Sequence, residues 1–141
     1  MPIVVIGSPM FSHYGSAARA VIKLAEQECR NANHYFLGTE HILLAMTIDP
    51  TPDIAAFFHD AHLDRYDVKR ALFAAMGDPA DHPWDGVLIT PRVQRVLAAA
   101  CARSGGPQAV QPRDIIDAIV EDGGGVAARV LAGLRATLPA R

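Results

Sequence analysis

The sequence predicts an all-α fold built from two similar halves. Apolar residues recur at intervals of three and four along most of the 141-residue chain, which is the spacing of one face of an α-helix. Threonine, proline and aspartate stand where these stretches begin, and glycine or proline stands where they end. Apolar pairs of the first half also recur 72 to 75 residues later, so the same helical unit is expected twice.

The first two helices are bounded by serine, glycine and proline. Ser16 is a suitable N-cap for the first helix, whose apolar face continues to about residue 31. Gly38 and Thr39 separate it from a second helix, which Pro50 ends because the residue before a proline resists helical geometry. The side chains expected to be buried here are Ala18, Val21, Ile22, Ala25, Cys29, Ile42, Leu43 and Met46.

Two more helices complete the first half. Thr51 and Pro52 open the third helix, since proline is well suited to the first helical position. Asp64 caps the fourth helix and Gly77 closes it. The side chains expected to face inward near the third helix are Ala55, Phe58 and Leu63.

The second half repeats the first three helices. Thr90 and Pro91 open one helix, Pro112 opens the next, and the glycines of "DGGG" precede the last. The closing stretch "LRATLPAR" is short, so we expect the fourth helix of the second repeat to be truncated or absent. The corresponding pairs are Val21-Ile22 with Val96-Leu97, Ile42-Leu43 with Ile115-Ile116, and Ala55-Ala56 with Ala127-Ala128.

One domain over residues 1–141 is therefore expected, because each half is too small to bury its own core. Val4, Val5 and Ile6, near the N-terminus, are expected to cover the apolar face that the missing helix leaves bare. The predicted divisions are an extension at 1–9, a first repeat at 10–77, a linker at 78–88 and a second repeat at 89–141.

Composition narrows the function classes. With 13 Lys and Arg against 15 Asp and Glu, no basic excess exists to neutralise phosphates, so nucleic acid and anionic membranes are poor candidate partners. The sequence contains no GxxxxGK[ST] loop, so nucleotide hydrolysis is not supported. Cys29 and Cys101 form no CxxC pair, and the N-terminal apolar stretch lacks the features of a signal peptide. A soluble, cytoplasmic monomer is expected.

Glu40 is the first candidate for a functional side chain. It lies in the first turn of the second helix, where a carboxylate complements the helix dipole. A carboxylate beside the aromatic residues Phe11, Tyr14 and Tyr35 is also suited to binding a guanidinium, with the rings contacting its aliphatic stem. The two interpretations are compatible, and both stay open at this point.

Two other functions remain as alternatives. His59 and His62 are three residues apart in "HDAH", so a small metal-binding or hydrolytic protein that uses them is one alternative. A thiol nucleophile is disfavoured, because Cys29 falls on the apolar face of its helix. The other alternative is a self-association module, in which a groove between the halves binds a second copy.

The motifs of both halves resemble a known family. The stretches "ARAVIKLAEQECRNANHYFLGTEHILLAM", "ITPRVQRVLAAA" and "GGGVAARVLAGL" are similar to the N-terminal Clp repeat domain of Clp/Hsp100 unfoldases, above all of the ClpC type. The resemblance implies a non-catalytic domain without a cofactor that binds substrates or adaptor proteins for a Clp ATPase. In a stand-alone chain, it implies an adaptor, a competitor or a decoy in Clp proteolysis.

The resemblance also implies a set of binding residues. In ClpC-type domains two motif glutamates bind phosphoarginine, and the surface near the first phenylalanine binds cyclic peptides. Glu40 stands at the position of the first glutamate, and Phe11 stands at the position of that phenylalanine. Arg113 stands where the second glutamate would be, Gly15 replaces the threonine after Tyr14, and Ile89 replaces an aromatic residue. At most one of the two pockets is then intact. The expected peptide-binding residues are Phe11, Tyr14, Thr39, Glu40, Ile89, Thr90 and Arg113.

Overall fold

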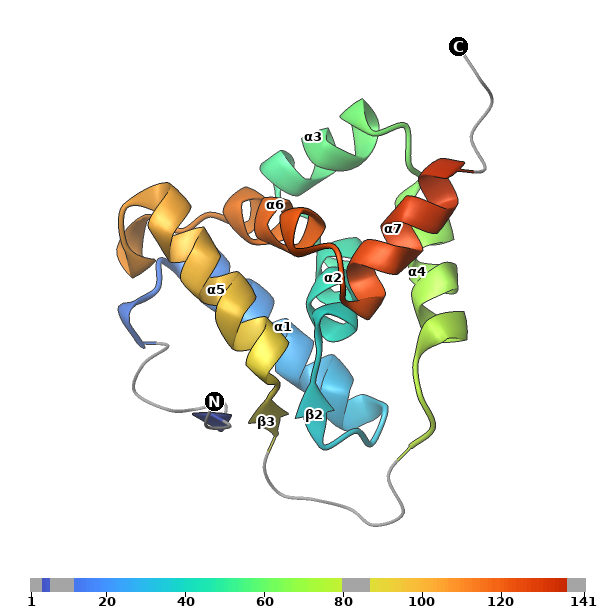
Figure 1. Ribbon diagram of the computed structural model, residues 1–141, viewed down its shortest axis with the longest axis horizontal. Coiled ribbons are helices and arrows are strands. Elements are labelled where there is room, and N and C mark those ends of the chain that lie inside the picture. The colour runs from blue at the N-terminus through green and yellow to red at the C-terminus, as the bar shows by residue number, and fades with distance from the viewer. Residues whose placement is uncertain (1–3, 6–11, 80–86, 137–141) are drawn as a thin grey trace.

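The regular secondary structure of the described part of the chain is almost entirely helical, as the sequence predicts (Figure 1). The computed structural model describes residues 4–5, 12–79 and 87–136. Within them lie seven α-helices, short 3₁₀ segments and three strands of two residues each. The described helices are all shorter or less apolar than a segment that could cross a lipid bilayer.

The first half contains four helices. They are α1 (Ser16–Asn31), α2 (Thr39–Ile48), α3 (Pro52–Asp60) and α4 (Arg65–Ala75). Two caps differ from the prediction. Gly15, in extended backbone, is the N-cap of α1 in place of Ser16, and α4 ends at Ala75 with Met76 as its cap, so Gly77 closes nothing. Asp64 caps α4 as predicted, since its carboxylate accepts from the Tyr66 N–H.

The second half contains α5 (Pro91–Ser104), the 3₁₀ helix η2 (Pro107–Ala109), α6 (Pro112–Asp122) and α7 (Val126–Ala136). Thr90 caps α5 by accepting a hydrogen bond from the Val93 N–H, as predicted. Gly123 ends α6 with φ of 72°, in the left-handed region that favours glycine. All three helical starts predicted from proline and glycine are therefore confirmed.

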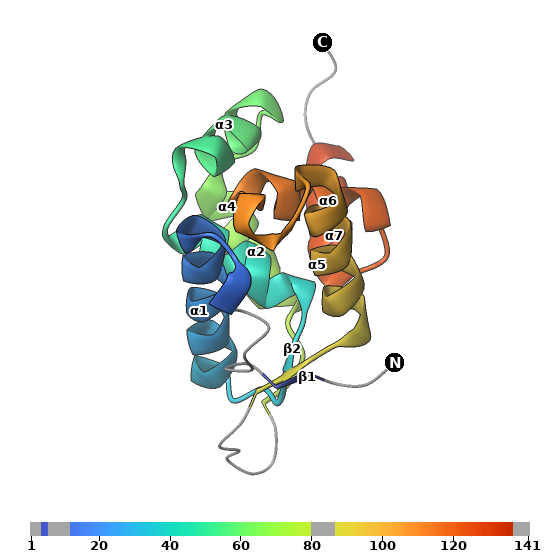
Figure 2. The same ribbon diagram turned by 90° about the vertical axis from the view of Figure 1, so that its left-hand side faces the viewer.

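Helix α2 occupies the centre of the fold (Figure 1). Eight of its ten residues are buried, and it contacts α1, α4 and α7. In the view of Figure 2, α2 lies between α1 and α5. A helix that is buried on nearly all sides needs polar partners only at its ends, so the chemistry of α2 is concentrated in its first turn.

The buried positions repeat between the halves. Ala18, Val21, Ile22 and Ala25 of α1 correspond to Val93, Val96, Leu97 and Ala100 of α5, and all eight side chains are buried. Ile42, Leu43, Ala45 and Met46 of α2 correspond in the same way to Ile115, Ile116, Ala118 and Ile119 of α6. The predicted duplication is therefore visible in the core itself.

The third pair of helices corrects the predicted register. Ala55 and Ala56 are exposed, whereas Ile54 and Phe58, one turn apart, are buried. Ile54 and Phe58 correspond to Ala127 and Leu131, which are also buried. The larger apolar side chains thus decide which face of α3 turns inward, because they bury more surface than alanine.

Three short strands were not predicted. They are β1 (Val4–Val5), β2 (Phe36–Leu37) and β3 (Leu88–Ile89), in the order β1-β3-β2. β3 pairs antiparallel with β1 and parallel with β2. The backbone of Val4 and Val5 pairs with β3, and Ile6 lies outside the described residues. That these residues cover the apolar face left bare by the missing helix stays a prediction.

Helix α4 breaks the symmetry of the two halves. It contacts both α2 and α7, so it packs against one helix of each half (Figure 1). Among the residues that the structure describes, the second half has no helix after α7. The predicted divisions between extension, repeats and linker stay predictions, and residues 80–86 of the linker are outside the description.

Candidate functional site

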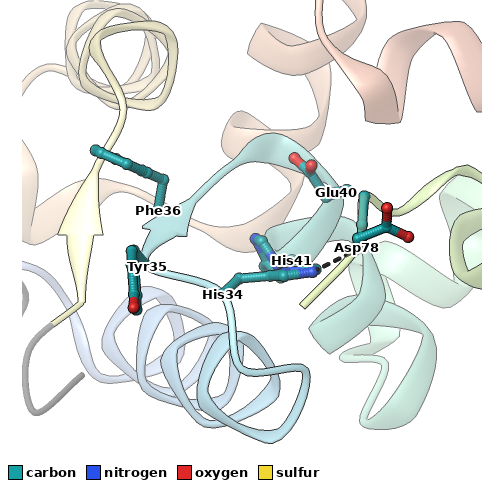
Figure 3. A pocket seen from close by; sticks show the side chains of 7 residues that line it. His34, Tyr35, Phe36, Glu40, His41 and Asp78 are labelled. Carbon is teal, nitrogen blue, oxygen red and sulfur yellow. Dashed lines mark hydrogen bonds between the residues drawn. The ribbon is translucent and has the colours of Figure 1, made fainter. Parts of the chain in front are cut away.

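An open depression lies at the start of α2 (Figure 3). Its volume is about 280 Å³, and its walls come from the connection between α1 and α2, the first turn of α2, and the residues after α4. We call it the α2 pocket. Its lining residues are His34, Tyr35, Phe36, Glu40, His41, Gly77 and Asp78.

Gly38 shapes the edge of the α2 pocket. It is the N-cap of α2, and its N–H donates to Nδ1 of His41 at 2.9 Å. A Cβ atom on Gly38 would overlap the Oε1 atom of Glu40, so the carboxylate of Glu40 lies directly over this glycine. The helix dipole favours a negative charge at this point. The sequence "GTEH" therefore places a carboxylate at a defined position at the mouth of the pocket.

The charges of the α2 pocket are negative. Glu40 and Asp78 line one side of the view in Figure 3, and Tyr35 and Phe36 line the other. Among the described residues neither carboxylate forms an ion pair. Phe36 is 47% exposed, which is unusual for a large apolar side chain. Two carboxylates and two aromatic rings that line one depression suit a cation with an apolar stem.

Two histidines connect the walls of the α2 pocket. Nδ1 of His34 lies 2.9 Å from Nε2 of His41, and Nε2 of His34 lies 2.9 Å from the carbonyl oxygen of Gly77. His41 is 1% exposed. Its burial, and then its neighbour His34, lower the pKa of His41 to about 4. His41 therefore carries no positive charge that would compete with a cationic ligand near neutral pH.

The structure separates Tyr14 from the α2 pocket. Tyr14 is 7% exposed and belongs to the core. Its hydroxyl oxygen accepts a hydrogen bond from the Cys101 thiol at 3.4 Å, and burial raises the pKa of Tyr14 above its usual range. Tyr35, the neighbour of Phe36, provides the aromatic wall instead. Phe11 lies outside the described residues.

Three further predicted residues have structural contacts. Thr39 is buried, and its hydroxyl oxygen accepts a hydrogen bond from the Ala127 N–H at 3.3 Å, which joins the starts of α2 and α7. Ile89 is buried in β3, and Thr90 caps α5. None of these three lines the α2 pocket. Their direct contact with a peptide stays a prediction.

Arg113 already has partners in both halves. Its Nε atom donates to Asp117 at 3.2 Å, and its guanidinium lies 5.2 Å from the centre of the Phe57 ring. Its backbone N–H also donates to the carboxylate of Asp53 at 2.9 Å. The position that corresponds to Glu40 thus carries a cation in contact with an acidic and an aromatic side chain.

Sequence reasoning missed several lining residues of the α2 pocket. His34 and His41 were visible as neighbours of the helix start, but nothing in the sequence shows that their rings meet. Asp78 reaches the pocket only because α4 brings the chain back to α2. Its position depends on tertiary structure, and no local signal in the sequence reports it.

The metal alternative loses its geometric basis. Helix α3 ends at Asp60, so His62 is not on the same helical face as His59; it lies in a turn with φ of 59°. In residues 4–5, 12–79 and 87–136 no group of three potential metal ligands comes together. Cys29 is buried as predicted: its thiol donates to the His34 carbonyl oxygen at 3.3 Å, and burial raises its pKa to about 12.

Comparisons of sequence identify relatives over most of the chain. The sequence model of the Clp repeat (R) N-terminal domain matches residues 13–134. The ClpA homolog of Porphyra purpurea, an ATP-binding subunit of the ATP-dependent Clp protease, is 32% identical over 127 residues. These residues are 89% of this chain and 16% of that protein. Chaperone protein ClpC1 of Arabidopsis thaliana chloroplasts is 31% identical over 129 residues, 90% of this chain and 14% of that protein.

Solved structures share the fold at lower identity. The N-domain of ClpV from Vibrio cholerae has a TM-score of 0.70 and 19% identity, and the match covers 87% of this chain and 75% of that one. The N-terminal domain of the chaperone ClpD from Arabidopsis thaliana has a TM-score of 0.62 and 20% identity, with 88% of each chain covered. A complex of a ClpV N-domain with VipB peptide has a TM-score of 0.64 and 16% identity, with 86% and 76% covered.

Proposed function

The chain belongs to the Clp repeat (R) N-terminal domain family, and we propose that it binds proteins or peptides without catalysing a reaction. The match over residues 13–134 confirms the resemblance seen in the sequence. A protein with the same fold, the ClpV N-domain, is described in complex with VipB peptide. A peptide-binding role for this chain follows from that precedent and from its own surface.

The α2 pocket is the observation that carries the proposal. It combines two carboxylates without described ion-pair partners and two aromatic side chains in one open depression of about 280 Å³. An arginine or lysine side chain of a peptide fits this chemistry, because its charged end meets Glu40 and Asp78 while its stem contacts Tyr35 and Phe36. A peptide laid across the surface would thus be anchored by one cationic residue.

The finer role rests on the family. The chain spans about one sixth of the length of the curated relatives that it matches. We propose a role in Clp proteolysis, as an adaptor, a competitor or a decoy, with a Clp ATPase or an adaptor protein as partner. The proposal keeps the cytoplasmic location and the monomeric state expected from the sequence, and cyclic peptides remain candidate ligands.

Titration calorimetry with a blocked peptide that has a single central arginine tests the pocket. Glu40→Ala is expected to weaken binding by about tenfold or more, because a charge-assisted hydrogen bond is lost. Glu121→Ala is the matched control: Glu121 lies on α6, its side chain is 73% exposed, and within the described part of the chain its ion pair is with Arg103, so its loss should leave the affinity unchanged. Equal weakening by both variants would reject the α2 pocket as the binding site.

A second titration separates two kinds of ligand. The same peptide carrying phosphoarginine tests the binding preference that the family resemblance implies. The α2 pocket presents carboxylates and no described lysine or arginine toward a phosphate, so we expect the unmodified peptide to bind more tightly. Tighter binding of the phosphorylated peptide would show that the phosphate is recognised by residues outside this pocket.

A further inference from the structure

The two histidines beneath the α2 pocket form a hydrogen-bond chain whose direction is fixed at both ends. At one end the backbone N–H of Gly38 can only donate, so Nδ1 of His41 must accept. At the other end the carbonyl oxygen of Gly77 can only accept, so Nε2 of His34 must donate. Between them, the 2.9 Å contact from His41 Nε2 to His34 Nδ1 has one possible donor, His41.

This direction determines the charge state of the pair. Each imidazole has one hydrogen, on Nε2, and one acceptor, on Nδ1, so both rings are neutral. A further proton on Nδ1 of His34 would face the N–H of His41 and break the contact. A further proton on Nδ1 of His41 would break the contact with Gly38. The chain of hydrogen bonds therefore exists only in the neutral pair.

The chain of hydrogen bonds also joins the two segments that hold the carboxylates. Gly38 and His41 belong to the start of α2, beside Glu40, whereas Gly77 follows α4 and precedes Asp78. The hydrogen bond from Nε2 of His34 to the carbonyl oxygen of Gly77 links the segment after α4 to the connection before α2. Without it, Asp78 has no described contact that fixes it beside Glu40.

We propose that His34 is a positioning residue of the α2 pocket. It holds the Gly77–Asp78 wall against the start of α2 only while both histidines are neutral. Proton uptake by the pair and binding of a cationic side chain therefore oppose each other. The inference rests on the proposed function and adds its regulation. A bound guanidinium beside the pair would disfavour a second positive charge there. By linkage, a proton on the pair lowers the affinity for the guanidinium by the same factor.

The ionisable groups around the pair come from three elements and one connection. Glu40 lies on α2, Asp78 follows α4, Tyr35 belongs to the connection, and Cys29 of α1 donates its thiol to the carbonyl oxygen of His34. Burial opposes protonation of His41 most strongly, and the neighbouring His34 opposes it next. Loss of the pocket is therefore expected as the pH falls toward about 4 rather than at neutral pH.

Binding of the single-arginine peptide from about pH 8 to about pH 4 tests the proposal. The affinity of the unchanged protein should fall by about twofold or more at the lower end, because about half of His41 is protonated at its pKa. His34→Gln keeps a donor and an acceptor but does not titrate, so it should bind nearly as well at pH 8 and lose little affinity at lower pH. His34→Ala should bind about tenfold more weakly at every pH.

His59→Gln is the matched control. His59 has an exposed side chain on α3 and does not line the α2 pocket, so this variant should follow the unchanged protein at every pH. An affinity of the unchanged protein that is independent of pH, or full binding by His34→Ala, would overturn the proposal.

Nitrogen NMR of the imidazoles gives a readout that needs no ligand. At about pH 8 both His34 and His41 should show the tautomer with hydrogen on Nε2. A hydrogen on Nδ1 of either ring would overturn the hydrogen-bond chain, whatever the binding data. If the expected tautomers are present and no peptide binds at pH 8, the proposed function of the pocket fails, and the positioning role fails with it. The hydrogen bonds between the two histidines, Gly38 and Gly77 would still be confirmed.

Discussion

The absence of a side chain at Gly38 is what allows the Glu40 carboxylate to lie over the start of α2. The backbone of Gly38 has φ of −102°, which any residue can adopt, so glycine is needed here for space and not for conformation. This makes a test of the carboxylate position possible without removing its charge.

Gly38→Ala should displace the Glu40 carboxylate and weaken the binding of the arginine peptide by about threefold to tenfold, since a charge-assisted contact is lost or lengthened. Gly133→Ala is the control, because a Cβ atom on Gly133 meets nothing within 4 Å. The control should keep full affinity and raise the free energy of unfolding by up to about 1 kcal/mol, since alanine favours the helix. Full affinity of Gly38→Ala, measured by calorimetry, would show that the carboxylate position is unimportant.

The buried His41 also makes the stability depend on pH. Its pKa is about 4 in the folded protein and near 6.5 in an unfolded chain, so the unfolded state binds more protons between these values. The free energy of unfolding should therefore rise from about pH 4 to about pH 6.5, by up to about 3 kcal/mol from this residue. Urea unfolding at a series of pH values measures the rise, and His41→Gln should flatten it. An equal rise in the variant would assign the effect to other groups.

At the scale of single elements, the sequence predicts the helices well and their inner faces less well. The prolines and threonines that open α3, α5 and α6 stand at fixed distances from the first helical residue, so local rules find these starts. The face of α3 could not be found in this way, because "IAAFF" offers apolar residues on several sides. The strands of two residues are shorter than any alternation that a sequence can display.

Substitutions in α3 distinguish the two possible registers. Ile54→Ala should lower the free energy of unfolding by about 2 to 4 kcal/mol, because Ile54 is fully buried. Ala55→Glu should change it by less than about 0.5 kcal/mol, because Ala55 is exposed. Chemical denaturation of both variants measures the difference. A large loss of stability in Ala55→Glu would restore the register that the sequence alone suggests.

At the scale of the whole molecule, the two halves share one core. Helix α7 of the second half contacts α2 and α4, and α6 contacts α1 and α3 of the first half. The hydrogen bond from the Ala127 N–H to the Thr39 hydroxyl oxygen joins the halves at the start of two helices. The predicted duplication thus accounts for the repeated sequence pattern, whereas the unit that folds is the whole domain.

Native-state hydrogen exchange can measure this coupling. The most protected amides of α2 and of α6 should exchange with the same free energy of opening, since neither half has a core of its own. Leu131→Ala, which shortens a buried side chain of α7, should lower both values equally. Exchange of one half at a clearly lower free energy than the other would show that the halves unfold separately.

The candidate site could be predicted only in part, because contacts between distant segments of the chain build much of it. Glu40 follows from the rule that carboxylates favour the first turn of a helix, and that rule needs only neighbouring residues. His34 and Asp78 enter the α2 pocket through contacts between segments about 40 residues apart, which the sequence does not reveal. Tyr14 shows the opposite error: an aromatic residue near a motif is buried in the core.

The unpaired helix α4 has a consequence for how many ligands one molecule can hold. The wall with Asp78 follows α4, and the described second half has neither such a helix nor a carboxylate at the position of Glu40, where Arg113 stands. A duplicated fold would ordinarily suggest two equivalent sites, yet the proposed function gives this fold a stoichiometry of one cationic side chain per chain. Any avidity toward a partner with many basic residues would then have to come from several copies of the domain arranged together, and not from the internal repeat.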